Sequence, residues 1–117
     1  MKYNETTLYY FRTAETAGVL TGPGTQRGAA GTRERGTWVQ FDVLIGEGVI
    51  RDARFLAFGC PHTIAVSAWV AEQAVARGAR AALPESVQDL SVRFAVPVEK
   101  RGRLLIIEDA WLAALRH

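Results

Sequence analysis

Two runs of alternating apolar and polar residues, joined by a glycine turn, constrain the fold of this chain more than any other feature. Residues 38–45 and 49–58 each place apolar side chains at every second position. A period of two is typical of half-buried β-strands. The linking residues Gly46-Glu47-Gly48 favour a tight turn. The sequence therefore predicts an antiparallel hairpin, with strands over 37–45 and 49–58 and one face buried.

Helical signals lie on both sides of this hairpin. Asn4 is a good capping residue, Pro61 suits the first position of a helix, and Gly78 suits a helix end. We expect helices over 4–12, 61–77, 84–90 and 103–115, an extended segment over 92–98, and a loop over 18–36 with one short strand near Val19–Leu20. This order predicts an α+β fold: a small antiparallel sheet with helices packed on one face.

The apolar positions of these elements predict the core. The residues expected to be mostly buried are Val39, Phe41, Val43, Phe55, Ile64, Ala68, Ala71 and Trp111. The chain has 117 residues, a common size for one domain, so we expect residues 1–117 to form a single domain.

Composition argues against several functional classes. The net charge is +2 and the basic residues are scattered, whereas nucleic-acid binding favours a basic stripe. The chain has one cysteine, so no intramolecular disulfide is expected and a reducing compartment is the simpler interpretation. We find no signal-peptide pattern and no apolar run long enough to span a bilayer. We therefore expect a cytoplasmic protein with neither nucleic-acid nor membrane partners.

The second strand and the turn after it carry a recognisable pattern. Ile50-Arg51-Asp52-Ala53-Arg54-Phe55, followed by Gly59-Cys60-Pro61-His62-Thr63-Ile64-Ala65, resembles the central block of the NifU/IscU iron–sulfur scaffold family. Ile107-Glu108-Asp109-Ala110 resembles that family's ending, and the helix from Tyr3 towards Ala17-Gly18 resembles its start. The resemblance covers almost the whole chain in the correct order. It implies a NifU/IscU N-terminal-domain-like fold.

The resemblance also implies a degenerate cluster site. The family uses three cysteines, because iron in these clusters prefers soft thiolate ligands. Only the middle cysteine is present, as Cys60. By alignment, Arg35 replaces the first cysteine and Thr37 its neighbouring aspartate, whereas Gly102 and Arg103 replace the histidine and the third cysteine. The family's chaperone-recognition segment aligns with Val96-Pro97-Val98-Glu99-Lys100, a candidate for partner docking.

Cys60 and His62 are the candidate metal ligands. For Cys60, the alternatives are a reactive thiolate at a helix start and a small buried hydrophobe. For His62, one alternative is a second ligand to zinc or to an iron–sulfur cluster, in a site that a homodimer would complete. The other is an exposed histidine on a helical turn, which is the simpler interpretation. The alignment further predicts that the guanidinium groups of Arg35 and Arg103 approach Cys60 and lower its pKa.

Three functions remain open from the sequence. The first is a divergent iron–sulfur assembly scaffold that binds a cluster weakly or not by itself. The second is a non-catalytic interaction module that kept the fold. The third is a reactive-thiol protein, in which Cys60 accepts sulfur or senses an oxidant. The resemblance implies a cysteine desulfurase or a chaperone as partner, and no catalytic motif indicates an enzyme.

Overall fold

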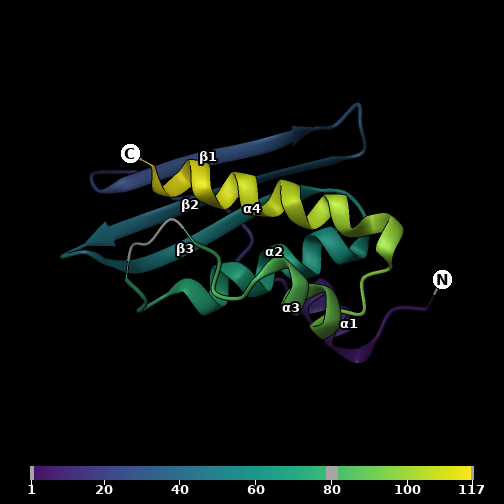
Figure 1. The fold of residues 1–117 in the computed structure, drawn as a ribbon. Coiled ribbons are helices and arrows are strands. Elements are labelled where there is room, and N and C mark those ends of the chain that lie inside the picture. The colour runs from purple at the N-terminus through teal and green to yellow at the C-terminus, as the bar shows by residue number, and fades with distance from the viewer. Residues whose placement is uncertain (1, 79–81, 117) are drawn as a thin grey trace.

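A three-stranded antiparallel sheet organises the fold in the computed structural model, which describes residues 2–78 and 82–116 (Figure 1). Strands β1 (Thr25–Thr32), β2 (Thr37–Gly46) and β3 (Val49–Phe58) lie in the order β1-β2-β3. The hairpin predicted from the alternation is β2–β3. Its two loop residues, Glu47 and Gly48, have φ angles of 55° and 74°, as a tight hairpin turn requires.

Helices pack on one face of this sheet, which confirms the predicted α+β class. Helix α4 (Arg101–Leu115) packs against β1 and β2, and α2 (Pro61–Ala74) packs against β3. Helix α1 (Glu5–Thr13) packs on α2, and α3 (Val87–Arg93) packs on α4. A short 3-10 helix, η1 (Val98–Lys100), leads into α4. None of the helices in the described part of the chain is long and apolar enough to cross a lipid bilayer.

The hydrophobic core lies between the sheet and these helices. Phe41 from β2 stands opposite Phe55 from β3, and its ring meets the Trp111 ring edge-on at 5.1 Å. Seven of the eight residues predicted to be mostly buried are buried. Ile64 is only half-buried. Helix α2 is covered by α1 as well as by the sheet, so buried residues such as Trp69 extend around it rather than along one stripe.

Strand β1 shows that the loop predicted over 18–36 is wrong in part. Val19 is about half exposed and lies outside the strands, whereas β1 pairs with β2 along its whole length. The strand is rich in small residues, and the packing of α4 requires a glycine at position 28. A Cβ atom on Gly28 would lie 2.1 Å from the backbone nitrogen of Ala114, so α4 passes directly over the backbone of β1.

Helix α2 ends at Ala74, three residues before the predicted end. The chain then turns, and Ala76 adopts a φ of 73°. Ala76 N–H donates to the Ile50 carbonyl at 2.8 Å, and Ile50 N–H donates to the Arg77 carbonyl at 2.9 Å. These bonds satisfy the outward-facing N–H and C=O of Ile50 on the edge strand β3, which a longer helix would leave unpaired.

The expectations for residues 84–98 also need correction. The helix there runs over Val87–Arg93, not 84–90, because Ser86 caps it: its hydroxyl oxygen accepts from Asp89 N–H at 3.1 Å. Residues 92–98 do not form one extended segment, and within this range Pro97 has extended backbone angles. Val92 and Arg93 complete α3, and Val98 begins η1.

The face of the sheet away from the helices carries an ion pair between a buried carboxylate, Asp42, and a half-exposed arginine, Arg27. Asp42 is 1% exposed and accepts from Arg27 Nε at 2.7 Å and Arg27 Nη2 at 2.9 Å. It also accepts from Leu20 N–H at 2.8 Å. Burial favours the neutral acid, but these hydrogen bonds and the Arg27 charge hold the pKa of Asp42 below its usual range. The Asp42 carboxylate on β2 therefore binds both Arg27 of β1 and the backbone of Leu20, and so holds the Leu20 segment against the sheet.

Candidate functional site

Cys60 lies at the junction of strand and helix that the sequence predicted. It follows β3 by two residues and is the N-cap of α2, with Pro61 as the first helical residue. Its side chain is half-buried. The sulfur lies 3.7 Å from Thr63 Oγ1, a contact that the sequence analysis missed. A hydroxyl residue three positions after the helix cap is the signal that predicts it.

Arg103 brings a positive charge to this sulfur. Its Nη1 donates a hydrogen bond to Cys60 Sγ at 3.1 Å. Arg103 lies in the first turn of α4, so the contact joins the starts of the two helices that cover the sheet. Seen from Cys60, a fixed cation stands where the family resemblance places a third cysteine.

The surroundings of Cys60 favour its thiolate. Burial by itself raises the pKa of the thiol. The backbone amides of Thr63 and His62, the Thr63 hydroxyl and the Arg103 charge act in the opposite direction and together bring the pKa below its ordinary value. The two amides stabilise the anion without forming a capping hydrogen bond of ordinary geometry.

His62 is buried, which shows that the interpretation as an exposed histidine is wrong. The residue is 2% exposed, and the Tyr3 ring covers it edge-on with 4.7 Å between ring centroids. Neither ring nitrogen makes a hydrogen bond of ordinary geometry within the described residues. Burial lowers the pKa of His62, as do the charges of Lys100 and Arg103, whereas the Phe94 carbonyl has a weaker opposite effect.

The other aligned ligand positions lie near the same end of the sheet but make different contacts. Arg35 is in the exposed turn between β1 and β2, where its N–H donates to Thr32 Oγ1 at 3.2 Å. Thr37 begins β2 and is buried. Gly102 is exposed in α4, and a Cβ atom added there would meet no atom within 4 Å. Of the two arginines predicted to approach Cys60, it is Arg103 whose charge acts on the sulfur.

The aligned docking segment is divided between core and surface. Val96 is 7% exposed and belongs to the core, and Pro97 caps η1. Val98 is 72% exposed and Glu99 is exposed as well. The Lys100 ammonium lies over the Tyr3 ring, 5.4 Å from its centroid. The surface that this segment offers a partner is therefore small, with Val98 as its apolar centre.

These donors do not fit an iron–sulfur cluster or a tightly bound zinc ion. Such sites take three or four thiolate, imidazole or carboxylate ligands. Within residues 2–78 and 82–116 no three His, Cys, Asp or Glu side chains lie close enough to hold a metal ion together. The Arg103 guanidinium beside the Cys60 sulfur repels cations and offers only hydrogen-bond donors.

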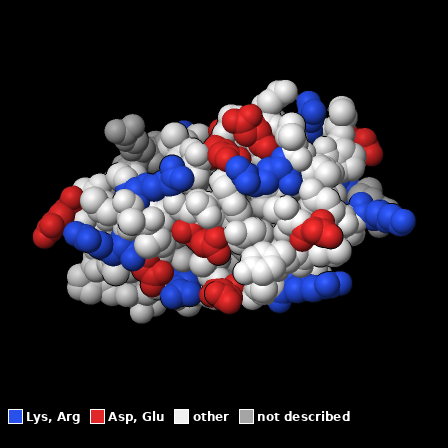
Figure 2. Space-filling view, turned by 90° about the horizontal axis from the view of Figure 1, so that it is seen from below, with Lys and Arg blue, Asp and Glu red and all other residues white. Residues whose placement is uncertain are grey.

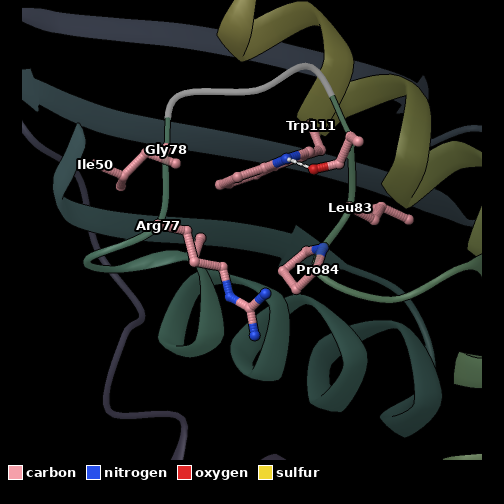
Figure 3. Close-up of a pocket in the computed structure, with 8 residues that line it drawn as sticks. Ile50, Arg77, Gly78, Leu83, Pro84 and Trp111 are labelled. Atoms are coloured by element: carbon pink, nitrogen blue, oxygen red, sulfur yellow. Dashed lines mark hydrogen bonds between the residues drawn. The ribbon is translucent and has the colours of Figure 1, made fainter. Parts of the chain in front are cut away.

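A pocket of about 390 Å³ lies at the opposite end of the sheet, where β3 begins (Figure 3). Ile50 and Ala74 contribute apolar walls, and Arg77 lies at its margin. Trp111 Nε1 donates to the Ala82 carbonyl at 2.9 Å inside this pocket. It is separated from Cys60 by the full length of β3, so it is not part of the thiolate site.

Sequence comparison identifies relatives of the whole chain. The model of the NifU-like N terminal domain matches residues 2–117. The iron-sulfur cluster assembly protein IscU of Plasmodium falciparum is 32% identical over 82 residues, covering 70% of this chain. The chain spans about half (51%) of that relative's length. The iron sulfur cluster assembly protein 1 of Encephalitozoon cuniculi is 27% identical over 118 residues, covering 98% of this chain and 84% of the relative.

Solved structures show the same fold. A putative iron-sulfur cluster assembly scaffold protein for the SUF system from Fervidobacterium islandicum superposes with a TM-score of 0.75 at 16% identity, covering 97% and 96% of the two chains. The N-terminal part of a NifU-like protein from Brucella abortus gives a TM-score of 0.74 at 20% identity, covering 97% and 91%. The chain belongs to the NifU-like N-terminal domain family, a family of iron–sulfur cluster assembly scaffolds.

Proposed function

We propose that this protein is a divergent iron–sulfur assembly scaffold that does not hold a cluster with its own ligands. The observation that supports this most directly is the 3.1 Å contact between Arg103 Nη1 and Cys60 Sγ. At the one cysteine of the chain, Arg103 supplies a cation where the alignment places a ligand in the family. Coulomb repulsion between the guanidinium and an incoming metal ion opposes cluster binding, since the two positive charges would lie within a few ångströms of each other.

Any metal binding by the isolated chain then uses Cys60 with His62 and is weak. Two protein ligands are fewer than a structural zinc site or a cluster needs. His62 would have to leave its contact with Tyr3 or bind from a buried position, and both cost free energy. We expect an apparent zinc affinity well short of the roughly 10–16 kcal/mol of complete structural zinc sites.

We infer that the retained scaffold fold acts as a non-catalytic interaction module in iron–sulfur assembly, with residues 1–117 as one domain. The family relationship supports a cysteine desulfurase or a chaperone as partner, and Val96–Lys100 as one docking segment. A homodimer that combines two Cys60–His62 pairs is the arrangement in which this chain would gain enough ligands. The substituted positions Arg35, Thr37, Gly102 and Arg103 distinguish it from a cluster-holding scaffold.

A second function, a reactive thiol at Cys60, is favoured by a separate observation. The pKa of Cys60 is lowered by the Thr63 and His62 amides and by Arg103, and its side chain is half-buried rather than enclosed. Low-pKa, accessible thiols are the ones that accept sulfur or react with oxidants. The two functions are compatible, because neither requires a bound metal.

Anaerobic reconstitution tests the first proposal. The protein is incubated with ferrous iron, sulfide and a thiol reductant, desalted, and analysed for iron, acid-labile sulfide and visible absorbance. We expect the wild type to retain far less than one iron per chain. The Arg35→Cys/Arg103→Cys double variant returns cysteines to two aligned positions and should retain more. The proposal fails if the wild type keeps stoichiometric iron and sulfide, and a Cys60→Ser variant then shows whether the thiolate is a ligand.

A further inference from the structure

One end of the molecule gathers three segments that are distant in the sequence. The turn 33–36 joins β1 to β2, and Trp38, the second residue of β2, lies opposite Phe58 at the end of β3. Cys60 follows Phe58 by two residues and contacts Arg103 of α4. Figure 1 shows this turn, the start of α2 and the start of α4 on the same side of the molecule, together with the N-terminus. Residues 33–36, 58–60 and 99–103 form what we call the basic end.

The basic end carries the positive charge of the chain. Its cations are Arg33, Arg35, Lys100, Arg101 and Arg103, and its carboxylates are Glu34 and Glu99. Five of the 14 basic residues and two of the 12 acidic ones lie here, so the remaining nine and ten nearly cancel. On the face seen in Figure 2, blue and red groups alternate across the middle, and several blue groups and one red group lie towards the right-hand side.

The contacts of Arg33 with two aromatic rings favour binding of an anionic partner. Its guanidinium carbon lies 5.3 Å from the Trp38 ring centroid and 6.0 Å from that of Phe58. No ion pair among the described residues uses Arg33. Contact with the two rings limits the rotamers of the side chain, while its outer N–H groups remain available to a carboxylate. Less side-chain entropy is then lost when a partner binds.

The surroundings favour a protein over a nucleic acid. Because Arg33 lies over Trp38 and Phe58, those rings are not free to stack on bases, which single-stranded nucleic acids need. Glu34 and Glu99 interrupt the cations, so this end lacks the continuous basic stripe that nucleic-acid binding favours. Apolar contact area is present beside them, since Phe58 is 47% exposed and Val98 is 72% exposed.

We propose that the basic end docks an acidic segment of a partner protein, with carboxylates on Arg33 and Arg101 and apolar side chains on Phe58 and Val98. The inference rests on the proposed function, because docking would bring the partner to the Cys60 site. Docking itself needs neither a metal nor the thiol. Charge complementarity of this kind sets the association rate and the choice of partner, and it weakens with added salt.

The test uses the full chain and a short fluorescein-labelled peptide in which Glu alternates with Leu, measured by fluorescence anisotropy at low salt. The Arg33→Gln/Arg101→Gln variant should bind roughly five- to thirtyfold more weakly, as expected for two exposed charge contacts. The matched control, Arg51→Gln/Arg116→Gln, removes the same charge at the opposite end of the sheet and should change the affinity by less than about twofold. A Gln-for-Glu peptide should not bind measurably.

Three results would overturn the inference: no binding of the acidic peptide at low salt, equal loss of affinity in both double variants, or tighter binding of oligouridylate than of the peptide. Amide chemical shifts provide a second measurement and should move at 33–36, 58–60 and 99–103. Reconstitution with iron and sulfide is a separate experiment that tests only the proposed loss of cluster binding. A failure of peptide docking would not contradict that loss, and cluster binding by the wild type would not contradict peptide docking.

Discussion

Arg103 donates a hydrogen bond to the sulfur of Cys60, a residue 43 positions earlier in the chain. The contact connects the first turn of α4 to the cap of α2 at the edge of the core. It places the Cys60 thiol in direct contact with one positively charged side chain. Four measurements follow from this site and from the packing that supports it.

Replacing Arg103 with Ala should raise the pKa of Cys60. The change removes a positive charge and a hydrogen-bond donor that stabilise the thiolate, so less thiolate is present at neutral pH. Iodoacetamide should then alkylate Cys60 several-fold more slowly at pH 7, with the midpoint of the pH–rate profile shifted upwards. Arg35→Ala is the comparison, and we expect its profile to match the wild type. Identical profiles for the wild type and Arg103→Ala would mean that Arg103 does not act on the thiol.

Replacing His62 with Phe should stabilise the protein, most clearly in acid. The buried ring nitrogens make no hydrogen bond of ordinary geometry among the described residues, and a phenyl ring removes their desolvation cost. The pKa of His62 is lowered by burial, Lys100 and Arg103, so the unfolded chain binds a proton more readily than the folded one. The protonation of His62 therefore does not reduce the free energy of unfolding above about pH 6.5. Below that pH, proton binding by the unfolded chain lowers the free energy of unfolding.

Urea unfolding at pH 5 and pH 8 checks this prediction. The advantage of His62→Phe should be roughly 1 kcal/mol or more at pH 8 and larger at pH 5. The truncation His62→Ala should destabilise at both pH values, because it leaves a cavity under Tyr3. If the Phe variant is less stable than the wild type at both pH values, the imidazole makes a favourable interaction that outweighs its desolvation.

Gly28→Ala should destabilise the protein strongly. The added Cβ would lie 2.1 Å from Ala114 N and 2.4 Å from the Ala113 carbonyl carbon, so α4 must move away from β1. Overpacking of this kind costs about 1–3 kcal/mol, occasionally more. Gly102→Ala is the matched control, since its Cβ meets no atom within 4 Å and a helical Ala gains up to about 1 kcal/mol over Gly. Equal unfolding midpoints for the two variants would contradict the close contact.

Asp42→Asn should lower the free energy of unfolding at pH 7 by about 1–3 kcal/mol, because it removes the charge that pairs with Arg27. The folded-state pKa of Asp42 is depressed, so its contribution is present above the unfolded value of about 3.9 and is lost as the pH falls through the folded value. The difference from the wild type should therefore shrink in acid. Glu47→Gln, at the exposed Glu47–Arg51 pair, should change stability by less than about 1 kcal/mol.

Strong local patterns predicted β2, β3, α1, α4 and the start of α2 well. The alternation over 38–45 and 49–58 reports one buried face directly, and Asn4 accepts from Thr7 N–H at 2.9 Å as the cap of α1. Strand β1 was missed because its glycines are locally typical of loop residues, whereas Gly28 is required by α4, a helix that lies more than 70 residues later in the chain. No residue close to Gly28 in the sequence indicates its contact with Ala114 of α4.

The candidate site was predicted in part and for a similar reason. The position of Cys60 at a strand end and helix start follows from local sequence, and alignment placed Arg103 near it. The burial of His62 could not be predicted from nearby residues. It depends on Tyr3 and on Phe94, which lie far from His62 in the sequence. The role of Arg33 was also missed, since Trp38 and Phe58 become neighbours only when the strands pair.

The open surroundings of Gly102 bear on how such a protein arises. Gly102 has free space around it and Arg35 lies in an exposed turn, so neither position helps to hold the core together. Ligand residues there can be exchanged by single substitutions while the sheet and helices stay intact. Residues 35 and 102 therefore affect what this end of the molecule can bind more than whether the chain folds.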